Sequence, residues 1–174
     1  MPTRLAAVIP LMLALGGCAM MAPKPAPAPT APVRYTGTPQ EQWEQGQAAY
    51  LAWSAARPGW TTTESGLQYH RVKAAKASAP KPAPGAVVTI HYVGKFIDGR
   101  VFDSSRARNE PATFPLDRLI RGWQEGVPMM RVGEGWEFVI PASIGYGDRN
   151  RDPIPPGSAL LFEIELIAIP DDQG

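Results

Sequence analysis

The second half of the chain alternates apolar and polar residues with the period of a β-strand. Val88, Ile90 and Tyr92 occupy every second position of one apolar run. In the last run, from 159 to 169, the alternate positions are Leu160, Phe162, Ile164, Leu166 and Ala168. A period of two places such side chains on one face of a strand. The pattern therefore predicts two strands, each with one buried face.

Turn residues indicate how the strands are connected. Asp98-Gly99 separates two apolar runs, and an Asp-Gly pair in that position is typical of a β-hairpin. A second turn at 133–135 joins residues 130–132 to the apolar run 136–140. Short turns of this kind connect antiparallel neighbours, so we expect an antiparallel sheet.

Two segments have the composition of helices. Good helix formers dominate 40–56, and Pro58-Gly59 ends that run. The residues near one face of this helix are Trp43, Gln47, Tyr50 and Trp53 or Ser54. We interpret the helix as packing on the domain that follows it, and a dimer contact is the alternative. A shorter helical piece near 121–127 is limited by Pro128, and one short helix among antiparallel strands predicts an α+β fold.

Proline-rich segments divide the chain into units. Residues 18–39 are rich in Pro, Ala and Thr, which cannot form a helix and bury little, so we expect an extended tether. A second segment of this kind, 74–85, follows a strand predicted over 65–72, which the downstream domain completes. The expected units after the tether are a short helical segment at 40–63, a lead-in strand and linker at 64–85, and a globular domain at 86–170.

Residues 1–17 have the pattern of a secretory signal peptide, with a positive residue followed by an apolar run. The sequence Leu15-Gly16-Gly17-Cys18 resembles the lipobox of bacterial lipoproteins. In that family the Cys is acylated, so the resemblance implies a lipid anchor on Cys18 and a place in the bacterial cell envelope. Ala19, rather than Asp, follows the Cys, which favours the outer membrane, with the domain facing the periplasm or the surface. The alternative is an ordinary secretory signal peptide that is cleaved a few residues after Cys18, which would remove this Cys from the mature chain.

The overall composition excludes several functions. The 174 residues include 17 Lys and Arg and 16 Asp and Glu, a net charge of +1. This balance argues against a strongly basic nucleic-acid binder. One Cys and two His exclude a disulfide framework and are too few for a zinc site of the usual kind. We therefore expect neither a metal nor a cofactor.

Six short motifs occur in order between Val88 and Ile169. They are Tyr92-Val93-Gly94, Asp98 to Ser105, Ile120 to Trp123, Ile144 to Gly147, Ile154-Pro155-Pro156 and Leu161 to Leu166. Together they resemble the FKBP-type peptidyl-prolyl cis-trans isomerase domain across its full length, in a bacterial lipoprotein form. The resemblance implies an antiparallel, half-open sheet wrapped around a short helix.

The resemblance also implies a pocket for the proline of an X-Pro peptide. Trp123 would form its floor, and its walls would be Tyr92, Phe102 and Phe162. Taken one at a time, aromatic residues on one face of a strand more often belong to a core. The six motifs together favour the pocket.

The same resemblance implies which polar groups belong to the pocket. Asp103 would lie at its edge, held by Arg108 and Tyr92. The backbone N–H of Ile120, with Leu119 beside it, and the hydroxyl of Tyr146 would each donate to a substrate carbonyl. Ile154 would line the loop over the site.

Two stretches depart from the family pattern. Ala112 stands near a position that is often aromatic in small eukaryotic members, whereas Phe114 is retained. The loop 147–153 is more charged than an apolar cover would be.

By this resemblance, the chain is expected to isomerise X-Pro bonds and to assist the folding of secreted or envelope proteins. Its partners would be proline-containing unfolded polypeptides, macrolides of the rapamycin class and, through the lipid, a membrane. No nucleic acid is expected as a partner. The alternative is a chaperone or partner-binding module that keeps the FKBP fold with little catalysis.

Overall fold

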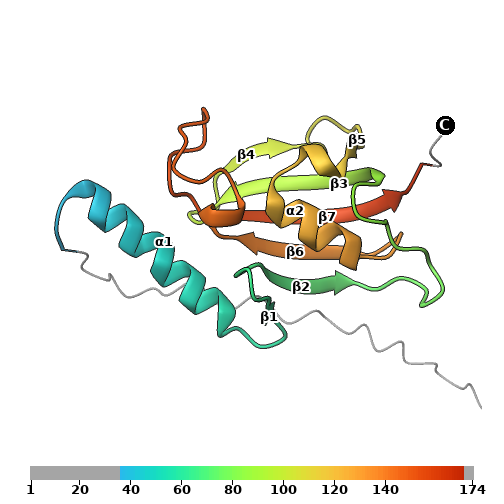
Figure 1. Ribbon diagram of the computed structural model, residues 1–174, viewed down its shortest axis with the longest axis horizontal. Coiled ribbons are helices and arrows are strands. Elements are labelled where there is room, and N and C mark those ends of the chain that lie inside the picture. Colours follow the sequence, from blue (N-terminus) through green and yellow to red (C-terminus); the bar gives the residue numbers. More distant parts are fainter. Residues whose placement is uncertain (1–35, 171–174) are drawn as a thin grey trace, which may run out of the picture.

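The computed structural model describes residues 36–170 (Figure 1). The predicted signal peptide, Cys18 and the tether up to residue 35 lie outside the described residues. Between residues 36 and 170, no helix combines the length and the apolar composition needed to cross a bilayer.

Seven antiparallel strands form one sheet in the order β1-β2-β6-β7-β3-β4, and β5 pairs with the other end of β3 (Figure 1). The strands are β1 Thr61–Thr62, β2 Gln68–Lys73, β3 Val87–Phe96, β4 Val101–Ser104, β5 Ala112–Pro115, β6 Gly135–Ile140 and β7 Leu160–Ala168. The two predicted alternating runs are β3 and β7, which pair with each other at the centre. The α+β class and the antiparallel sheet are confirmed.

The first predicted turn lies where expected, but the segment that leads into the second turn is not the expected strand. Gly99 adopts a positive φ of 87° between β3 and β4, which an Asp-Gly hairpin turn requires. Residues 130–132, however, do not form a strand before the turn at 133–135. They follow the 3-10 helix η2 (Val127–Met129), and Met130 is fully buried, so the chain enters the turn from the helical layer.

The helix α2 (Arg121–Gly126) lies across one face of the sheet and continues into η2 (Figure 1). Its side chains Trp123 and, one residue past its end, Val127 are buried in the common core with the inward residues of the strands. The helix approaches the sheet very closely at Gly126, where a Cβ atom would stand 2.6 Å from Cε1 of Phe138. A larger residue there would push α2 away from β6.

The helix α1 (Pro39–Ala55) lies against one end of the sheet and begins with a capping box formed by Thr38 and Glu41 (Figure 1). Three hydrogen bonds join it to the rest of the domain. Trp43 Nε1 donates to the carbonyl of Pro156 over 3.0 Å, and the buried Gln47 accepts from the N–H of Ala159 over 2.9 Å. At the other end, the amide of Gln68 donates to the carbonyl of Leu51. The predicted helix therefore packs on the following domain.

The lead-in strand is part of the sheet. β2 pairs antiparallel with β6, with Gln68 opposite Val139 and Tyr69 opposite Phe138. Leu67, just before β2, is fully buried among the core residues. The segment between the two predicted linkers thus extends the sheet by one full strand.

Candidate active site

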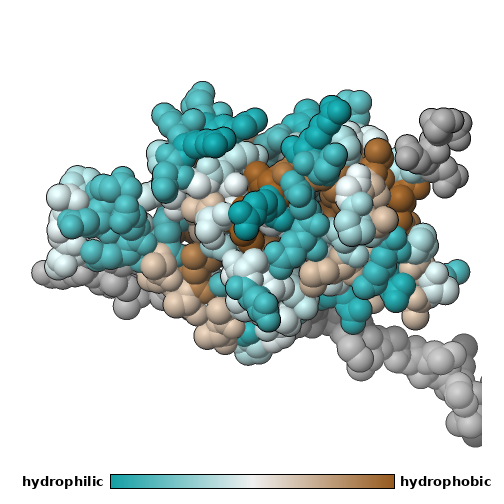
Figure 2. All heavy atoms as spheres, viewed as in Figure 1, coloured by the Kyte–Doolittle hydropathy of each residue, from teal (hydrophilic) through white to brown (hydrophobic). Residues whose placement is uncertain are grey.

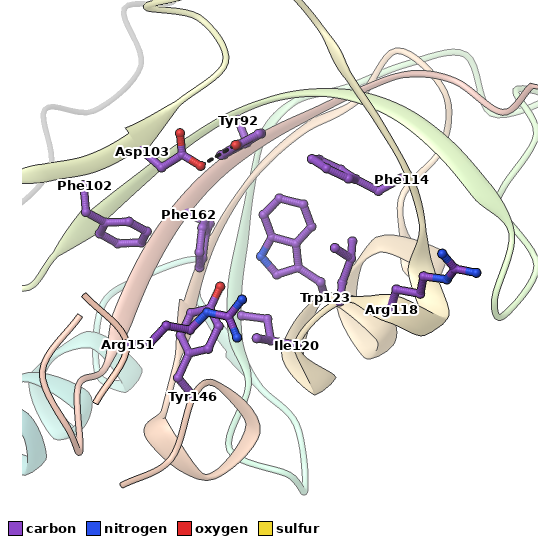
Figure 3. Close-up of a pocket in the computed structure, with 11 residues that line it drawn as sticks. Tyr92, Phe102, Asp103, Phe114, Arg118, Ile120, Trp123, Tyr146, Arg151 and Phe162 are labelled. Atoms are coloured by element: carbon purple, nitrogen blue, oxygen red, sulfur yellow. Dashed lines mark hydrogen bonds between the residues drawn. The ribbon is translucent and has the colours of Figure 1, made fainter. Parts of the chain in front are cut away.

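A cavity of about 410 Å³ opens between α2 and the strands on its side of the sheet (Figure 3). On the face of the molecule that carries α2, hydrophobic surface is visible between hydrophilic residues (Figure 2). Five of its six aromatic lining residues lie in the strands and α2: Tyr92 on β3, Phe102 on β4, Phe114 on β5, Trp123 on α2 and Phe162 on β7. The other lining residues are Asp103, Arg118, Leu119, Ile120, Tyr146 and Arg151. Five separate elements therefore supply aromatic groups to one site.

Trp123 forms the floor of the cavity. It is only 5% exposed, and its ring packs edge to face with the rings of Tyr92, Phe114 and Phe162. Its ring centroid lies 5.5 Å from that of Tyr92 and 5.1 Å from that of Phe162. Edge-to-face contacts at such separations hold aromatic rings in fixed orientations, so the floor and the walls form a rigid apolar surface.

The wall formed by Phe102 and Phe162 depends on a glycine in β3. A Cβ atom at Gly94 would stand 2.7 Å from Phe102 and 2.9 Å from Phe162, distances that real side chains do not tolerate. The absence of a side chain lets both rings close over this strand, with their centroids 5.7 Å apart. The packing of these two rings therefore explains why the third residue of the Tyr92-Val93-Gly94 motif is a glycine.

One carboxylate lies at the cavity edge, and two donors hold it. The hydroxyl of Tyr92 donates to Oδ2 of Asp103 over 2.5 Å (Figure 3). Arg108 donates to Oδ1 of Asp103 over 2.6 Å. Arg108 also donates to the Tyr92 hydroxyl over 3.0 Å. The three side chains form a closed triangle that fixes the carboxylate in one orientation.

The triangle also sets the charge of its members. Burial acts to raise the pKa of Asp103, but the hydrogen bonds from Tyr92 and Arg108 and the charge of Arg108 together outweigh burial, so the pKa lies below its ordinary value. Burial raises the pKa of Tyr92, and its hydrogen bond to Asp103 raises it further. At neutral pH the site thus holds an anionic carboxylate beside a neutral phenol.

Ile120 and Tyr146 both line the cavity, and each carries a hydrogen-bond donor without a protein partner in the described part of the chain. Ile120 lies just before the first turn of α2, and its N–H donates no hydrogen bond within residues 36–170. The hydroxyl of Tyr146, which follows the short helix η3 (Ala142–Ile144), has no partner in that part of the chain either. Both residues line the cavity (Figure 3), so both donors can bind the carbonyl groups of a peptide.

The structure brings together most of the residues that the sequence predicts for the site. Asp103, Tyr146, Ile120, Tyr92, Phe102, Leu119, Trp123 and Phe162 all line the cavity. Arg108 lies outside the lining and donates to Asp103. In the described part of the chain, His, Cys, Asp and Glu form no group of three or more that could hold a metal ion.

Ile154, which was expected to line the loop over the site, is not among the residues that line the cavity. Its side chain is 5% exposed and belongs to the hydrophobic core, and it does not line the cavity. The backbone of Ile154 pairs with that of Arg151 in a short antiparallel bridge. This bridge folds the loop back on itself, so Ile154 packs inward while Arg151 reaches the cavity.

Three lining residues are absent from the predicted list: Phe114, Arg118 and Arg151. Phe114 stands opposite Val88 in the pairing of β3 with β5, a register that the sequence pattern did not specify. Arg118 directly precedes the predicted Leu119-Ile120 pair, and its nearness to these residues was an available signal. Arg151 belongs to the charged loop, and its position depends on the bridge to Ile154.

A half-open antiparallel sheet, a short helix across it and an aromatic cavity between them define an FKBP-like domain. The family model described as FKBP-type peptidyl-prolyl cis-trans isomerase matches residues 78–167. This chain belongs to that family.

Named relatives and solved structures are similar to most of the chain. A 22 kDa FKBP-type isomerase of Escherichia coli is 46% identical over 121 residues, 69% of this chain and 58% of the relative. FkpA of Aeromonas hydrophila is 45% identical over 120 residues, which cover 69% of this chain and 44% of the FkpA chain. A crystal structure of a Pseudomonas syringae isomerase has a TM-score of 0.69 and 33% identity, and the match covers 77% of this chain and 98% of that one. The chain spans about half the length of the curated relatives it matches.

Proposed function

We propose that this protein is a peptidyl-prolyl cis-trans isomerase that acts on X-Pro bonds in polypeptides. The observation that carries the proposal is the aromatic cavity over Trp123, with Asp103 held at its edge by Tyr92 and Arg108. Its membership of the FKBP-type family supports the same activity.

The reaction needs a binding surface rather than a nucleophile. Rotation about an X-Pro bond crosses a barrier of about 18–20 kcal/mol because amide resonance is lost in the twisted state. The twisted carbonyl is less polar than the planar one, so a cavity poor in water binds it in preference to the ground state. In this chain the aromatic side chains that line the cavity would supply that environment, and the Ile120 N–H and the Tyr146 hydroxyl would hold carbonyl groups of the peptide.

The test is the isomerisation of a capped proline peptide by the full chain, followed by NMR exchange. We expect Trp123→Leu to lower kcat/KM at least about tenfold, because each factor of ten corresponds to about 1.4 kcal/mol of lost transition-state stabilisation. Trp60→Leu is the matched control. Trp60 stacks on His70, outside the cavity lining, so its loss should leave the rate unchanged. Far-UV circular dichroism establishes that both variants fold.

A wild-type chain with no isomerisation above the spontaneous rate would contradict the proposal. So would equal loss in the two Trp variants, because the effect would then come from general destabilisation rather than from the floor of the cavity.

We propose further that the protein is a lipoprotein of the bacterial cell envelope that assists the folding of secreted or envelope polypeptides. Support comes from the lipobox-like residues 15–18 and from a relative named outer membrane protein MIP, of Legionella longbeachae, 39% identical over 122 residues. Acyl chains on Cys18 would anchor the chain at the outer membrane. Macrolides of the rapamycin class would compete with proline peptides for the cavity.

The anchor is tested by the mass of the N-terminal peptide from the protein expressed in a bacterium. The expected peptide begins at Cys18 and is heavier than its sequence by the mass of the acyl groups. An unmodified peptide that begins after Cys18 would contradict the anchor without affecting the isomerase proposal.

A further inference from the structure

Two arginines line the cavity without an internal counter-charge. Arg118 and Arg151 are both exposed. Within residues 36–170, neither guanidinium forms an ion pair or a side-chain hydrogen bond, whereas the other arginine at the site, Arg108, is paired with Asp103. The single carboxylate of the lining is thus already neutralised. Among the residues that line the cavity, positive charge is therefore in excess.

The two arginines lie on different sides of the floor. In Figure 3, Arg118 extends from the segment before α2, and Arg151 lies over Tyr146, with Ile120 between them in the view. The Arg151 guanidinium stands 5.2 Å from the Tyr146 ring centroid, a cation–π contact that holds it beside the hydroxyl donor. A peptide whose proline rests on Trp123 extends from the cavity in two directions, and an arginine on each of two sides of the cavity can meet one of them.

There is also room for a polar side chain next to Arg151. A second cavity of about 360 Å³ shares Tyr146 and Arg151 with the first. Its remaining lining residues are Ser143, Gly145, Gly147, Arg149 and Asn150, which include hydrogen-bond donors and a further arginine but no carboxylate. Such a surface suits an anionic group and disfavours a cationic one.

We propose that the site prefers prolines flanked by acidic side chains, and that Arg118 and Arg151 are the residues that determine this preference. The inference rests on the proposed isomerase function and specifies the substrates of that same site. Glu or Asp next to the proline would pair with one arginine on each side of the ring, and Lys in either position would be repelled. The charged loop thus selects among client sequences while the aromatic floor binds the proline itself.

The experiment compares capped peptides that differ only by Glu or Gln immediately before or immediately after the proline. Because Glu and Gln have the same shape, the ratio of their kcat/KM values isolates the charge. For the wild-type full chain we expect Glu to exceed Gln by about two- to fivefold at each position, the range of exposed ion pairs. The ratio should approach one in about 1 M salt, where the screening length is only about 3 Å.

Variants of the two arginines test which residue determines the preference for Glu at each flanking position. Arg118→Gln should lower the Glu-to-Gln ratio toward one at one flanking position, and Arg151→Gln should lower it at the other. Arg121→Gln is the matched control. It removes the same charge three residues after Arg118, from an exposed side chain that lines neither cavity, so the ratio should keep its wild-type value. Each ratio is measured within one variant, so a general change in activity cancels.

The Kd values of the same peptides, from chemical-shift titration, separate this inference from the proposed function. Absence of isomerisation of every peptide would contradict the proposed function alone, because a tighter Kd for the Glu peptides would still support the preference. Equal kcat/KM and equal Kd for Glu and Gln peptides would overturn the preference while leaving the isomerase intact. A ratio that falls equally in the Arg121 control would also overturn it.

Discussion

Asp103 shows how single side chains prepare this site before any peptide arrives. Both of its oxygens are already occupied, one by the Tyr92 hydroxyl and the other by Arg108. The carboxylate therefore stays charged and oriented although it lies at the edge of an apolar cavity. The aromatic residues have a corresponding arrangement, since Gly94 provides the space in which Phe102 and Phe162 meet. At this scale, the shape of the pocket depends on close contacts among a few side chains.

The charge of Asp103 predicts a pH dependence of stability. Its pKa in the folded chain lies below the ordinary 3.8, so its contribution is present above that value and is lost as the pH falls through the folded pKa. We expect Asp103→Asn to lower the free energy of unfolding at pH 7, by under about 1 kcal/mol because the carboxylate is partly exposed. Urea unfolding should show this difference shrinking below pH 4. A difference that grows in acid would contradict the assignment.

A direct measurement of the same carboxyl group completes that test. Arg108→Gln removes the paired charge and one of the hydrogen bonds to Asp103, so a carbon-detected NMR titration should show the pKa of Asp103 higher than in the wild type. An unchanged pKa would mean that Tyr92 alone holds the carboxylate.

At the scale of elements, α1 matters because of where its polar contacts fall. Trp43 and Gln47 bond to the backbone of residues 156 and 159, on either side of the turn that leads from the charged loop into β7. The loop with Arg151 is therefore fixed at its far end by a helix that lies about a hundred residues earlier. α1 packs through specific hydrogen bonds, and its docking should be sensitive to single polar changes.

Gln47 provides the sharpest test of that docking. Gln47→Leu leaves the buried N–H of Ala159 without an acceptor, so the free energy of unfolding should fall by about 1–3 kcal/mol. Gln45→Leu makes the same substitution at an exposed position of α1 and should change it by no more than about 0.5 kcal/mol. Urea unfolding of the two variants measures both values. Equal effects would show that α1 does not depend on this contact.

At the scale of the whole molecule, the sheet extends beyond the segment that the family model matches. The match begins at residue 78, but β2 precedes it and covers the edge of β6, and the fully buried Leu67 fills the core beside Gly126. The sheet, α2 and the cavity are thus completed by residues from both sides of the proline-rich segment 74–85. That segment is a connection within one folded unit.

Truncation tests this description. A chain that begins at residue 78 exposes the edge of β6 and loses Leu67, and we expect it to be less stable than a chain that begins at residue 61 by more than about 2 kcal/mol. The bare edge should also promote association at high concentration. Urea unfolding and size-exclusion chromatography measure the two effects. Equal stability of the two chains would show that β2 is dispensable.

The sequence alone determined the class of the fold and most of the site. The alternation in β3 and β7 depends only on neighbouring residues, and a period of two assigns faces to a strand without further information. The motifs likewise gave Trp123, Tyr92, Phe102, Phe162, Asp103 and Tyr146, because these residues lie within short, ordered stretches. Ile120 and Leu119 were found in the same way.

Only the tertiary structure decided the features that depend on contacts between distant segments. The pairing of β5 with β3 brings Phe114 to the cavity. The bridge between Arg151 and Ile154 leaves the arginine at the cavity and the isoleucine in the core. The docking of α1 on the end of the charged loop is of the same kind. A loop residue has no periodicity to assign its side, so its direction is set by the packing that surrounds it, and the positive rim of this site is a product of that packing.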